Sequence, residues 1–291
     1  MAESKTVGSL VARARRSLDQ AGLENAAQET LWLLAHALGL QRHHLASKAE
    51  QPVSNELWAR AELLVARRAA REPLQYILGT QEFCGLEFHV SPAVLIPRPE
   101  TELLVQEVVR RGGLHEGGIL VDVGTGSGCV AITLATILNR ARIVALDRSP
   151  EALAVAKLNA ERHAVGDKIE WVEGDLLLPL RARGMAGEVD VLVSNPPYIA
   201  EADWPGLQPE VRDYEPRLAL VGGPRGTELP ERLLRDAREF LAPGKLLVME
   251  IGQDQAATLR RTAEQIGGYA ALQVVEDAAG IDRVVIAQRL G

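Results

Sequence analysis

The stretch VDVGTGSG, residues 121–128, decides the fold of this chain. It ends an apolar run that begins at residue 118, and it leads into a second apolar stretch that reaches Ile137. The first run predicts a buried strand and the second a helix. Glycines between them let the backbone turn sharply and approach a ligand without clashes at Cβ, beside the amides of the helix N-terminus. A tight turn without a ligand is the alternative.

The rest of residues 118–291 alternates strands and helices in the same way. The two last strands are joined by a short loop around Gly280 and should form an antiparallel hairpin. We therefore expect a mostly parallel, seven-stranded sheet covered by helices, a doubly wound α/β fold. The predicted strands are 118–123, 142–146, 169–173, 189–194, 245–251, 272–276 and 282–288. One predicted helix follows the glycine loop and ends at residue 137, and the others span residues 150–164, 230–241 and 254–266.

The first third of the chain has a different pattern. Apolar residues recur at helical spacing over residues 1–74, which predicts a small bundle of about four helices, one of them capped by Ser54. Two short β-type runs around Gly79 and Gly85 predict a β-hairpin linker over residues 75–98. Prolines 97 and 99 exclude a central strand, and Pro99 followed by Glu100 and Glu102 suits a helix start. A helix is therefore expected at about 100–111, within a domain of residues 99–291.

Composition restricts the function classes. The net charge of −7 argues against general attraction to a phosphate backbone. No apolar stretch approaches the length that spans a bilayer, and the first residues are not a secretory signal. Cys84 and Cys129 have no CxxC partner, and the six histidines show no ligand spacing. We expect a cytoplasmic, monomeric protein without a metal ion or a membrane contact.

The glycine pattern and two carboxylates indicate the kind of ligand. A nicotinamide dinucleotide prefers GxGxxG, whose third glycine would fall at Cys129, so the GxGxG pattern disfavours it. Asp147 ends the second strand and would accept hydrogen bonds from a ribose diol, unless it or Ser149 merely caps the next helix. Asp175, after the third strand, could reach an adenine amino group, and a solvated turn carboxylate is its alternative.

The fourth strand ends directly in Asn195-Pro196-Pro197-Tyr198. Two prolines fix the backbone and remove two N–H donors, which leaves carbonyls that can only accept. The Asn195 side-chain oxygen and the Pro196 carbonyl could take both protons of an NH2 group, while Tyr198 stacks on the planar group. A rigid proline turn is the alternative.

Such an acceptor pair suits methyl transfer to a planar nitrogen. An amide lone pair is delocalised into its carbonyl, and the nitrogen must become tetrahedral before it attacks a sulfonium methyl. Acceptors out of the amide plane favour that change and the positive charge that grows on nitrogen. No base is needed beforehand, because the methylated nitrogen is acidic and loses its proton afterwards.

These residues resemble the class I, Rossmann-like methyltransferases that depend on S-adenosylmethionine and act on amide or exocyclic nitrogens. Three further stretches narrow the resemblance: PLQYILG at 73–79, LIPRPETE at 95–102 and YEPRLAL at 214–220. With these, nearly the whole chain is similar to the peptide-chain release factor glutamine methyltransferases. The resemblance implies methylation of the glutamine side-chain nitrogen in the Gly-Gly-Gln motif of bacterial class 1 release factors, gripped by the N-terminal helices.

Residue by residue, the resemblance gives two sets of expected contacts. Leu176 stands where some relatives carry an aromatic residue, so stacking on adenine is uncertain there, and Arg98 and Glu100 have either a cofactor or a structural role. Asn195, Pro196, Pro197 and Tyr198 would bind the glutamine, with Asn195, Pro196 and Tyr198 catalytic. The cofactor contacts would be Gly124, Thr125, Gly126, Ser127, Gly128, Asp147, Asp175 and Leu176.

Two rival functions remain. An adenine methyltransferase of nucleic acid would use the same acceptor pair on an adenine amino group. It would need base flipping and a basic phosphate-contacting surface, which the acidic balance of the chain disfavours. A non-enzymatic scaffold that binds a cofactor and docks a partner is the second rival, and the intact acceptor segment argues against it.

Overall fold

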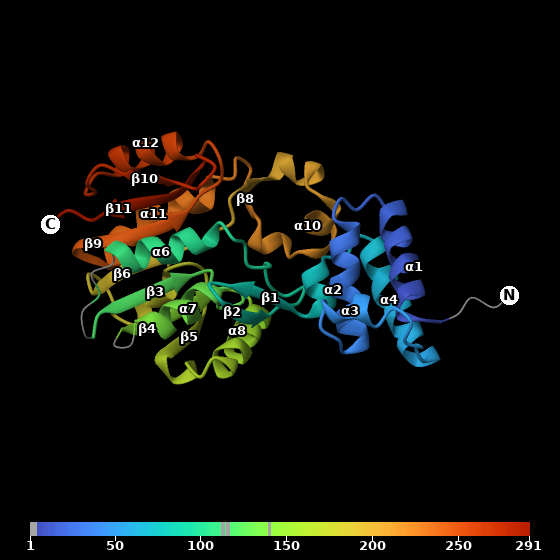
Figure 1. Ribbon diagram of the computed structural model, residues 1–291. Coiled ribbons are helices and arrows are strands. Elements are labelled where there is room, and N and C mark those ends of the chain that lie inside the picture. The colour runs from blue at the N-terminus through green and yellow to red at the C-terminus, as the bar shows by residue number, and fades with distance from the viewer. Residues whose placement is uncertain (1–4, 112–113, 115–116, 139–140) are drawn as a thin grey trace. The chain divides into compact units, whose positions relative to one another are not determined.

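The apolar run before the glycine loop forms strand β3 (Ile119–Val123), an inner strand of the larger sheet in the computed structural model (Figure 1). The structure describes residues 5–111, 114, 117–138 and 141–291. These fold into two compact units, one of residues up to 80 with 208–214, the other of 81–207 with 215–291. In the part of the chain described, no helix combines the length and apolar character needed to cross a membrane.

The second unit is built on a seven-stranded sheet in the order β10-β11-β9-β6-β3-β4-β5. The strands from β9 to β5 run parallel, while β11 is antiparallel to both of its neighbours. This confirms the predicted sheet and its terminal hairpin. The other strands are β4 (Arg142–Asp147), β5 (Ile169–Glu173), β6 (Val189–Ser194), β9 (Leu241–Glu250), β10 (Gln273–Glu276) and β11 (Asp282–Gln288).

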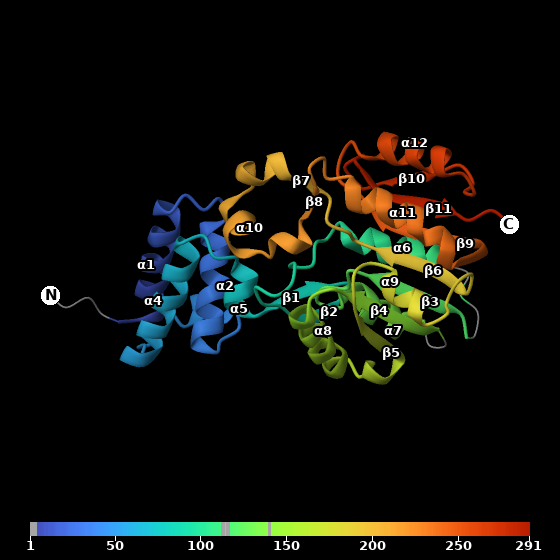
Figure 2. The same ribbon diagram turned by 180° about the vertical axis from the view of Figure 1, so that it is seen from behind.

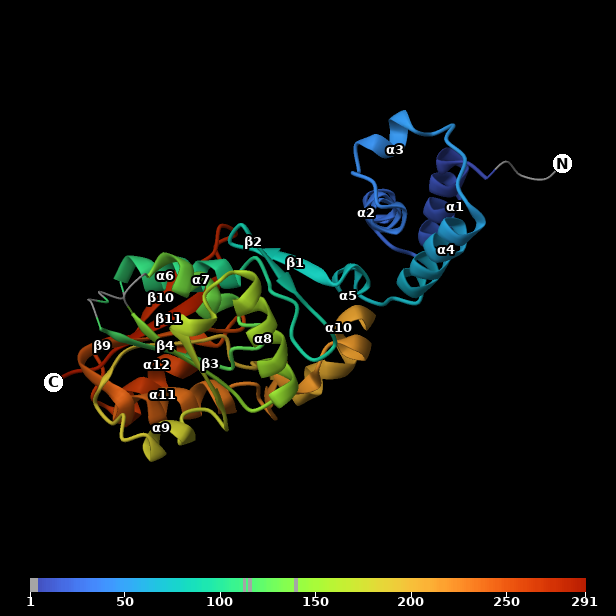
Figure 3. The ribbon, with the colours of Figure 1, turned by 90° about the horizontal axis from the view of Figure 1, so that it is seen from below.

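Helices cover both faces of this sheet, as the views in Figures 2 and 3 show. Alternate residues of β3 enter opposite cores: Val121 and Val123 pack with α9, α11 and α12, whereas Leu120 packs with α6, α7 and α8. Both faces are thus buried, which explains the continuous apolar strands. The helices are α6 (Thr101–Arg111), α7 (Cys129–Ile137), α8 (Pro150–Arg162), α9 (Leu178–Ala182), α11 (Glu228–Phe240) and α12 (Ala256–Ile266).

The first unit is the predicted helical bundle. Thr6 forms a capping box with Ser9, and Ser54 caps α4 through the Leu57 amide, as its position before an apolar stripe indicates. Leu10, Leu33 and their neighbours form its own apolar core. The helices are α1 (Val7–Gln20), α2 (Ala26–Leu38), α3 (His44–Ser47), α4 (Asn55–Ala69) and α5 (Leu74–Leu78).

One predicted strand is wrong. The apolar run before Gly79 is helix α5, and the hairpin consists of β1 (Thr80–Phe83) and β2 (Leu86–His89). Gly79 has a φ of +77° and donates its amide to the Gln75 carbonyl, so it ends a helix. Phe83 and Phe88 of the hairpin are buried in the α6–α7 core, which makes the hairpin part of the second unit.

Residues 208–214 join the first unit, although the sequence analysis includes them in 99–291. Here α10 (Pro209–Tyr214) brings Glu210 to Arg68 and Arg71 at 3.0 and 2.9 Å. Arg68, 6% exposed, also pairs with Glu29. Several short elements are not predicted from the sequence: α9, α10, the two-stranded sheet of β7 (Ile199–Ala200) and β8 (Val221–Gly223), and the 3-10 turns at Gly166–Lys168, Glu201–Gly206 and Arg217–Ala219.

Arg68→Ala should destabilise the first unit by about 3 kcal/mol or more, because it leaves two carboxylates without their buried cation. Thermal unfolding and amide exchange over 208–214 would measure the loss. Arg13→Ala is the control, since the Arg13–Glu62 pair is exposed and worth no more than about 1 kcal/mol. Equal effects of the two substitutions would refute the proposed anchoring of α10.

Candidate active site

The glycine loop is a compact turn fixed to the neighbouring strand. The amides of Gly124 and Thr125 both donate to the Leu146 carbonyl, at 2.8 and 2.9 Å. Gly128 begins α7 with a φ of +81°, and a Cβ there would lie 2.8 Å from the Ile132 side chain. The third glycine of the pattern therefore serves helix packing, while Gly124 and Gly126 line a cavity.

Asp147 closes this loop from β4. Its carboxylate accepts hydrogen bonds from the Gly126 and Ser149 amides, both at 2.9 Å. Burial raises the pKa of Asp147, and these amides act in the opposite direction. Ser149 is the N-cap of α8, because its hydroxyl accepts from Ala152. Asp147 is therefore not the cap, and its remaining lone pairs can accept from a ligand in the cavity.

Two polar side chains of the loop point into the protein. The Thr125 hydroxyl donates to the fully buried Asp122 at 2.7 Å, and burial raises the pKa of Asp122 to about 7. Ser127 is buried as well, and its carbonyl accepts from Asn159, which also bonds His89. Thr125 and Ser127 thus shape the loop, and neither lines the cavity, so their predicted cofactor contacts stay predictions.

The cavity beside the loop is mainly apolar and opens at the carboxyl ends of β3, β4 and β5, the usual ligand crevice of such sheets. Asp175 lines it but also pairs with Arg232 at 2.8 Å. Leu176 lines it with a φ of +47°. The other lining residues are Ala93, Val94, Leu95, Gly124, Gly126, Leu146, Asp147, Arg148, Ser149, Ala152, Gly174, Asn195, Pro197, Pro216, Leu218, Ala219 and Leu229.

Arg98 has a structural partner near this cavity. It forms an ion pair with Glu215, which is 6% exposed and accepts from the Ile96 amide at 3.2 Å. The pair ties the segment before α6 to the segment around Pro216. Neither Arg98 nor Glu100 is a lining residue, so of the two roles left open for Arg98 the geometry favours the structural one.

The Asn195–Tyr198 segment leaves the sheet next to the glycine loop. Ser194 is paired with Val123 across β6 and β3, and its hydroxyl donates to the Val123 carbonyl at 2.7 Å. Asn195 and Pro197 line the cavity. The Asn195 Nδ2 atom donates to the Thr101 hydroxyl at 3.0 Å. The amide oxygen of Asn195 is the polar atom left for a ligand.

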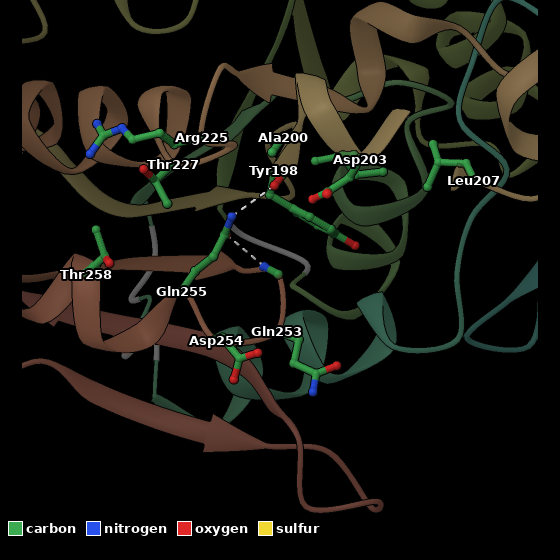
Figure 4. Close-up of a pocket in the computed structure, with 12 residues that line it drawn as sticks. Tyr198, Ala200, Asp203, Leu207, Arg225, Thr227, Gln253, Asp254, Gln255 and Thr258 are labelled. Carbon is green, nitrogen blue, oxygen red and sulfur yellow. Dashed lines mark hydrogen bonds between the residues drawn. The ribbon is translucent and has the colours of Figure 1, made fainter. Parts of the chain in front are cut away.

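Tyr198 lines a second cavity of about 510 Å³ (Figure 4), and neither it nor Pro196 lines the first. Its carbonyl accepts from Gln255 at 2.9 Å, and Gln255 is itself oriented by the Gly252 amide. Gly226 permits this packing, because a Cβ there would lie 2.4 Å from the Tyr198 carbonyl. The phenol donates to the Glu250 carboxylate at 3.4 Å, and burial raises the pKa of Tyr198 above its ordinary range.

The second cavity has acidic side chains in its wall. Asp203, Gln253 and Asp254 face it in Figure 4, and neither aspartate side chain has a hydrogen bond or ion pair with another described residue. Arg225, also at the rim, is neutralised by Glu228 and Glu231. The Asn195–Tyr198 segment therefore separates an apolar cavity from an open acidic one.

Sequence reasoning missed three residues that support this segment: Thr101, Glu250 and Gln255. The sequence does contain a signal for Glu250, since it directly follows the apolar residues Leu246–Met249, the last three of which are buried in β9. A carboxylate in that position needs a partner or a function. The sequence contains no such signal for Thr101, because a threonine at the start of a helix is common.

Comparison with known proteins fits this division of the chain. A family model described as "PrmC N-terminal domain" matches residues 9–79, and one described as "Methyltransferase small domain" matches 99–205. A methyltransferase of Pyrococcus furiosus covers 80% of this chain and 98% of its own, with 18% identity and a TM-score of 0.53. The match to the hMettl16 catalytic domain covers 77% of this chain and 81% of that structure's chain, with 20% identity and a TM-score of 0.58. Both share the fold.

The methyl donor is S-adenosylmethionine. The residues present fit it: the backbone of Gly124 and Gly126 can approach the cofactor closely, Asp147 has free acceptor positions for a ribose, and the cavity is apolar enough for an adenine ring.

Asp147→Ala should weaken S-adenosylmethionine binding at least about tenfold, because it removes a ribose acceptor and frees the Gly126 amide. Asp175→Ala should have a smaller effect, since Arg232 already occupies that carboxylate. Isothermal titration of each folded variant with S-adenosylmethionine measures its affinity for the cofactor. A larger effect at Asp175 would reverse the assignment of the two carboxylates.

Relatives that match nearly the whole chain identify its family. A release factor glutamine methyltransferase of Geobacter sulfurreducens is 48% identical over 271 residues, covering 93% of this chain and 92% of the relative. A release factor glutamine methyltransferase of Moorella thermoacetica is 43% identical over 284 residues, covering 98% of this chain and 99% of the relative. The match extends over both units and includes the glycine loop and the Asn195–Tyr198 segment. This chain belongs to the release factor glutamine methyltransferases.

Proposed function

We propose that this protein transfers a methyl group from S-adenosylmethionine to the side-chain amide nitrogen of the glutamine in the Gly-Gly-Gln motif of bacterial peptide-chain release factors, and so tunes translation termination. The observation that carries the proposal is the position of Asn195 and Pro197 in the wall of the cofactor cavity. The free polar groups of that segment accept hydrogen bonds, as a substrate NH2 requires.

The bound cofactor supplies an electrophilic methyl group on a sulfonium. The protein holds the glutamine amide so that Asn195 Oδ1 and the Pro196 carbonyl accept its two N–H groups. These acceptors favour a tetrahedral nitrogen and stabilise its growing positive charge. Tyr198 stacks on the amide plane and fixes its distance and angle. The methylated nitrogen then releases a proton to water, so no strong base is required.

The second cavity gives the substrate protein a place to bind. It is lined by Tyr198, is open, and carries the free carboxylates of Asp203 and Asp254. These features suit a polypeptide segment with amide donors and basic side chains next to the target glutamine. A small-molecule substrate would not need them.

The N-terminal unit provides a further binding surface for the release factor. None of its described residues lines the cofactor cavity, yet it exposes large apolar side chains: Leu31 and Trp32 are each 37% exposed and Leu63 is 62% exposed. Exposed aromatic and aliphatic side chains are typical anchors of protein interfaces. We further propose that the protein works as a monomer in the cytoplasm, with no direct contact to nucleic acid or membrane.

The decisive experiment is incubation with labelled S-adenosylmethionine and either purified release factor or adenine-containing DNA. Peptide mapping should place one methyl group on the Gly-Gly-Gln glutamine, and a release factor with alanine at that position should stay unlabelled. Asn195→Ala should lower turnover about 100-fold or more while cofactor affinity stays near normal. Label in DNA alone would refute the proposed substrate.

Leu63→Ala combined with Trp32→Ala should weaken release factor binding several-fold without changing cofactor affinity, because both side chains belong to the proposed grip. Leu158→Ala is the matched control, since Leu158 is an equally large, 51% exposed residue of the second unit. Binding is measured by titration of labelled release factor. If the control weakens binding as much, the N-terminal unit has no special role.

A further inference from the structure

Both ends of Tyr198 are held by one short stretch of chain, the last residue of β9 and the turn that follows it. The Tyr198 carbonyl accepts a hydrogen bond from Gln255 at 2.9 Å (Figure 4), and the phenol donates to Oε1 of Glu250 at 3.4 Å. Glu250 ends β9, and Glu250 and Gln255 are 1% and 9% exposed. Two buried side chains of residues 250–255 therefore hold a tyrosine that lies 52 and 57 positions before them in the chain.

Two glycines let the backbone approach Tyr198 closely. A Cβ on Gly252 would lie 3.1 Å from Cδ2 of the Tyr198 ring, and a Cβ on Gly226 would lie 2.4 Å from its carbonyl oxygen. The Gly252 amide also donates to the Gln255 side chain at 3.0 Å, and that side chain donates to the carbonyls of both Tyr198 and Gly226. The main chain of Tyr198 is thus fixed, and one edge of its ring lies against the backbone of Gly252.

The angle of the ring then depends on its far end. With its main chain fixed, a tyrosine keeps two side-chain torsions, and the second of them is broad. The hydrogen bond between the phenol and Glu250 restricts both torsions. A phenol has one proton, and here the Glu250 carboxylate accepts it, so the hydroxyl has none to donate to a substrate. Burial raises the pKa of Tyr198 above its ordinary range, which keeps the phenol neutral. Tyr198 therefore offers the site a ring face and neither an acid nor a base.

We propose that Glu250 is a positioning residue that acts through the Tyr198 phenol and sets the angle of the ring against the substrate amide. This inference rests on the proposed function, in which Tyr198 stacks on the glutamine side chain. Burying a carboxylate costs free energy, and Oε2 of Glu250 receives no hydrogen bond from a described residue. A role in catalysis explains a carboxylate in this position, since a small error in the angle between the attacking nitrogen and the methyl group lowers the rate of transfer.

The test measures kcat and KM of the full chain with purified release factor and S-adenosylmethionine. Glu250→Leu removes the acceptor of the phenol and should lower kcat about tenfold, the equivalent of one lost hydrogen bond, at unchanged cofactor affinity. Glu250→Gln keeps an oxygen that accepts from the phenol and should restore kcat to within about threefold of the wild type. Thermal unfolding shows whether each variant is folded at the assay temperature. A folded glutamine variant as slow as the leucine variant would overturn the inference.

A double-mutant cycle shows whether Glu250 acts through the phenol. Tyr198→Phe keeps the ring and removes the hydroxyl, so it should also lower kcat about tenfold. If the two residues act through one bond, the variant with both Tyr198→Phe and Glu250→Leu should lose about tenfold rather than about 100-fold. Removing both partners leaves neither group unpaired, so this double variant should be at least as stable as Glu250→Leu alone. Losses in kcat that multiply would show that Glu250 does not act through Tyr198.

Gly252→Ala tests the ring angle while the carboxylate stays in place. The backbone of Gly252 is not left-handed, so alanine can adopt it, but the added methyl would lie 3.1 Å from the ring and displace it by a few tenths of an ångström. The kcat should fall about tenfold at unchanged cofactor affinity. Gly166→Ala is the matched control, since a Cβ there meets no atom within 4 Å. Equal kcat values for these two alanine variants would contradict the inference, whereas a wild type that does not methylate release factor would instead refute the proposed function.

Discussion

The parallel pairing of β3 with β6 is the constraint on which the site depends. Val123 and Ser194 are the last paired residues, and the Ser194 hydroxyl binds the Val123 carbonyl at 2.7 Å. Both strands then end at the same level, so the glycine loop and the Asn195–Tyr198 segment emerge side by side. A shift of this register by one residue would move every side chain of β6 to the other face and separate the two loops.

Much of this arrangement was predictable from the sequence because it depends on short-range signals. The continuous apolar strands, the glycines at residues 124–128 and the prolines after Asn195 each restrict the backbone locally. A doubly wound sheet then requires the loops after β3 and β6 to share one edge. Asp147 could be predicted as well, since it ends the strand next to the loop, and its bond to the Gly126 amide agrees with that position.

The features that escaped prediction depend on contacts between distant residues. A five-residue apolar run fits a strand or a helix equally well, and the core around Ile77 decides for the helix α5. Residues 208–214 join the first unit through contacts such as those of Glu210 with Arg68 and Arg71, which lie 142 and 139 positions earlier in the chain. Thr101 is likewise ordinary in sequence and gains its importance from the Asn195 side chain, which the fold brings to it.

The ion pairs of Arg68 also have a consequence for synthesis on the ribosome. Its partner Glu29 emerges first, so the N-terminal helices can begin to assemble early, as N-terminal parts generally do. Glu210 follows 142 residues after Arg68, by which time β3, β4, β5 and β6 have already been made. The N-terminal unit can therefore be completed only after the glycine loop and the Asn195–Tyr198 segment have left the ribosome. A chain cut at residue 80 would lack α10 and keep Arg68 and Arg71 without one of their carboxylates.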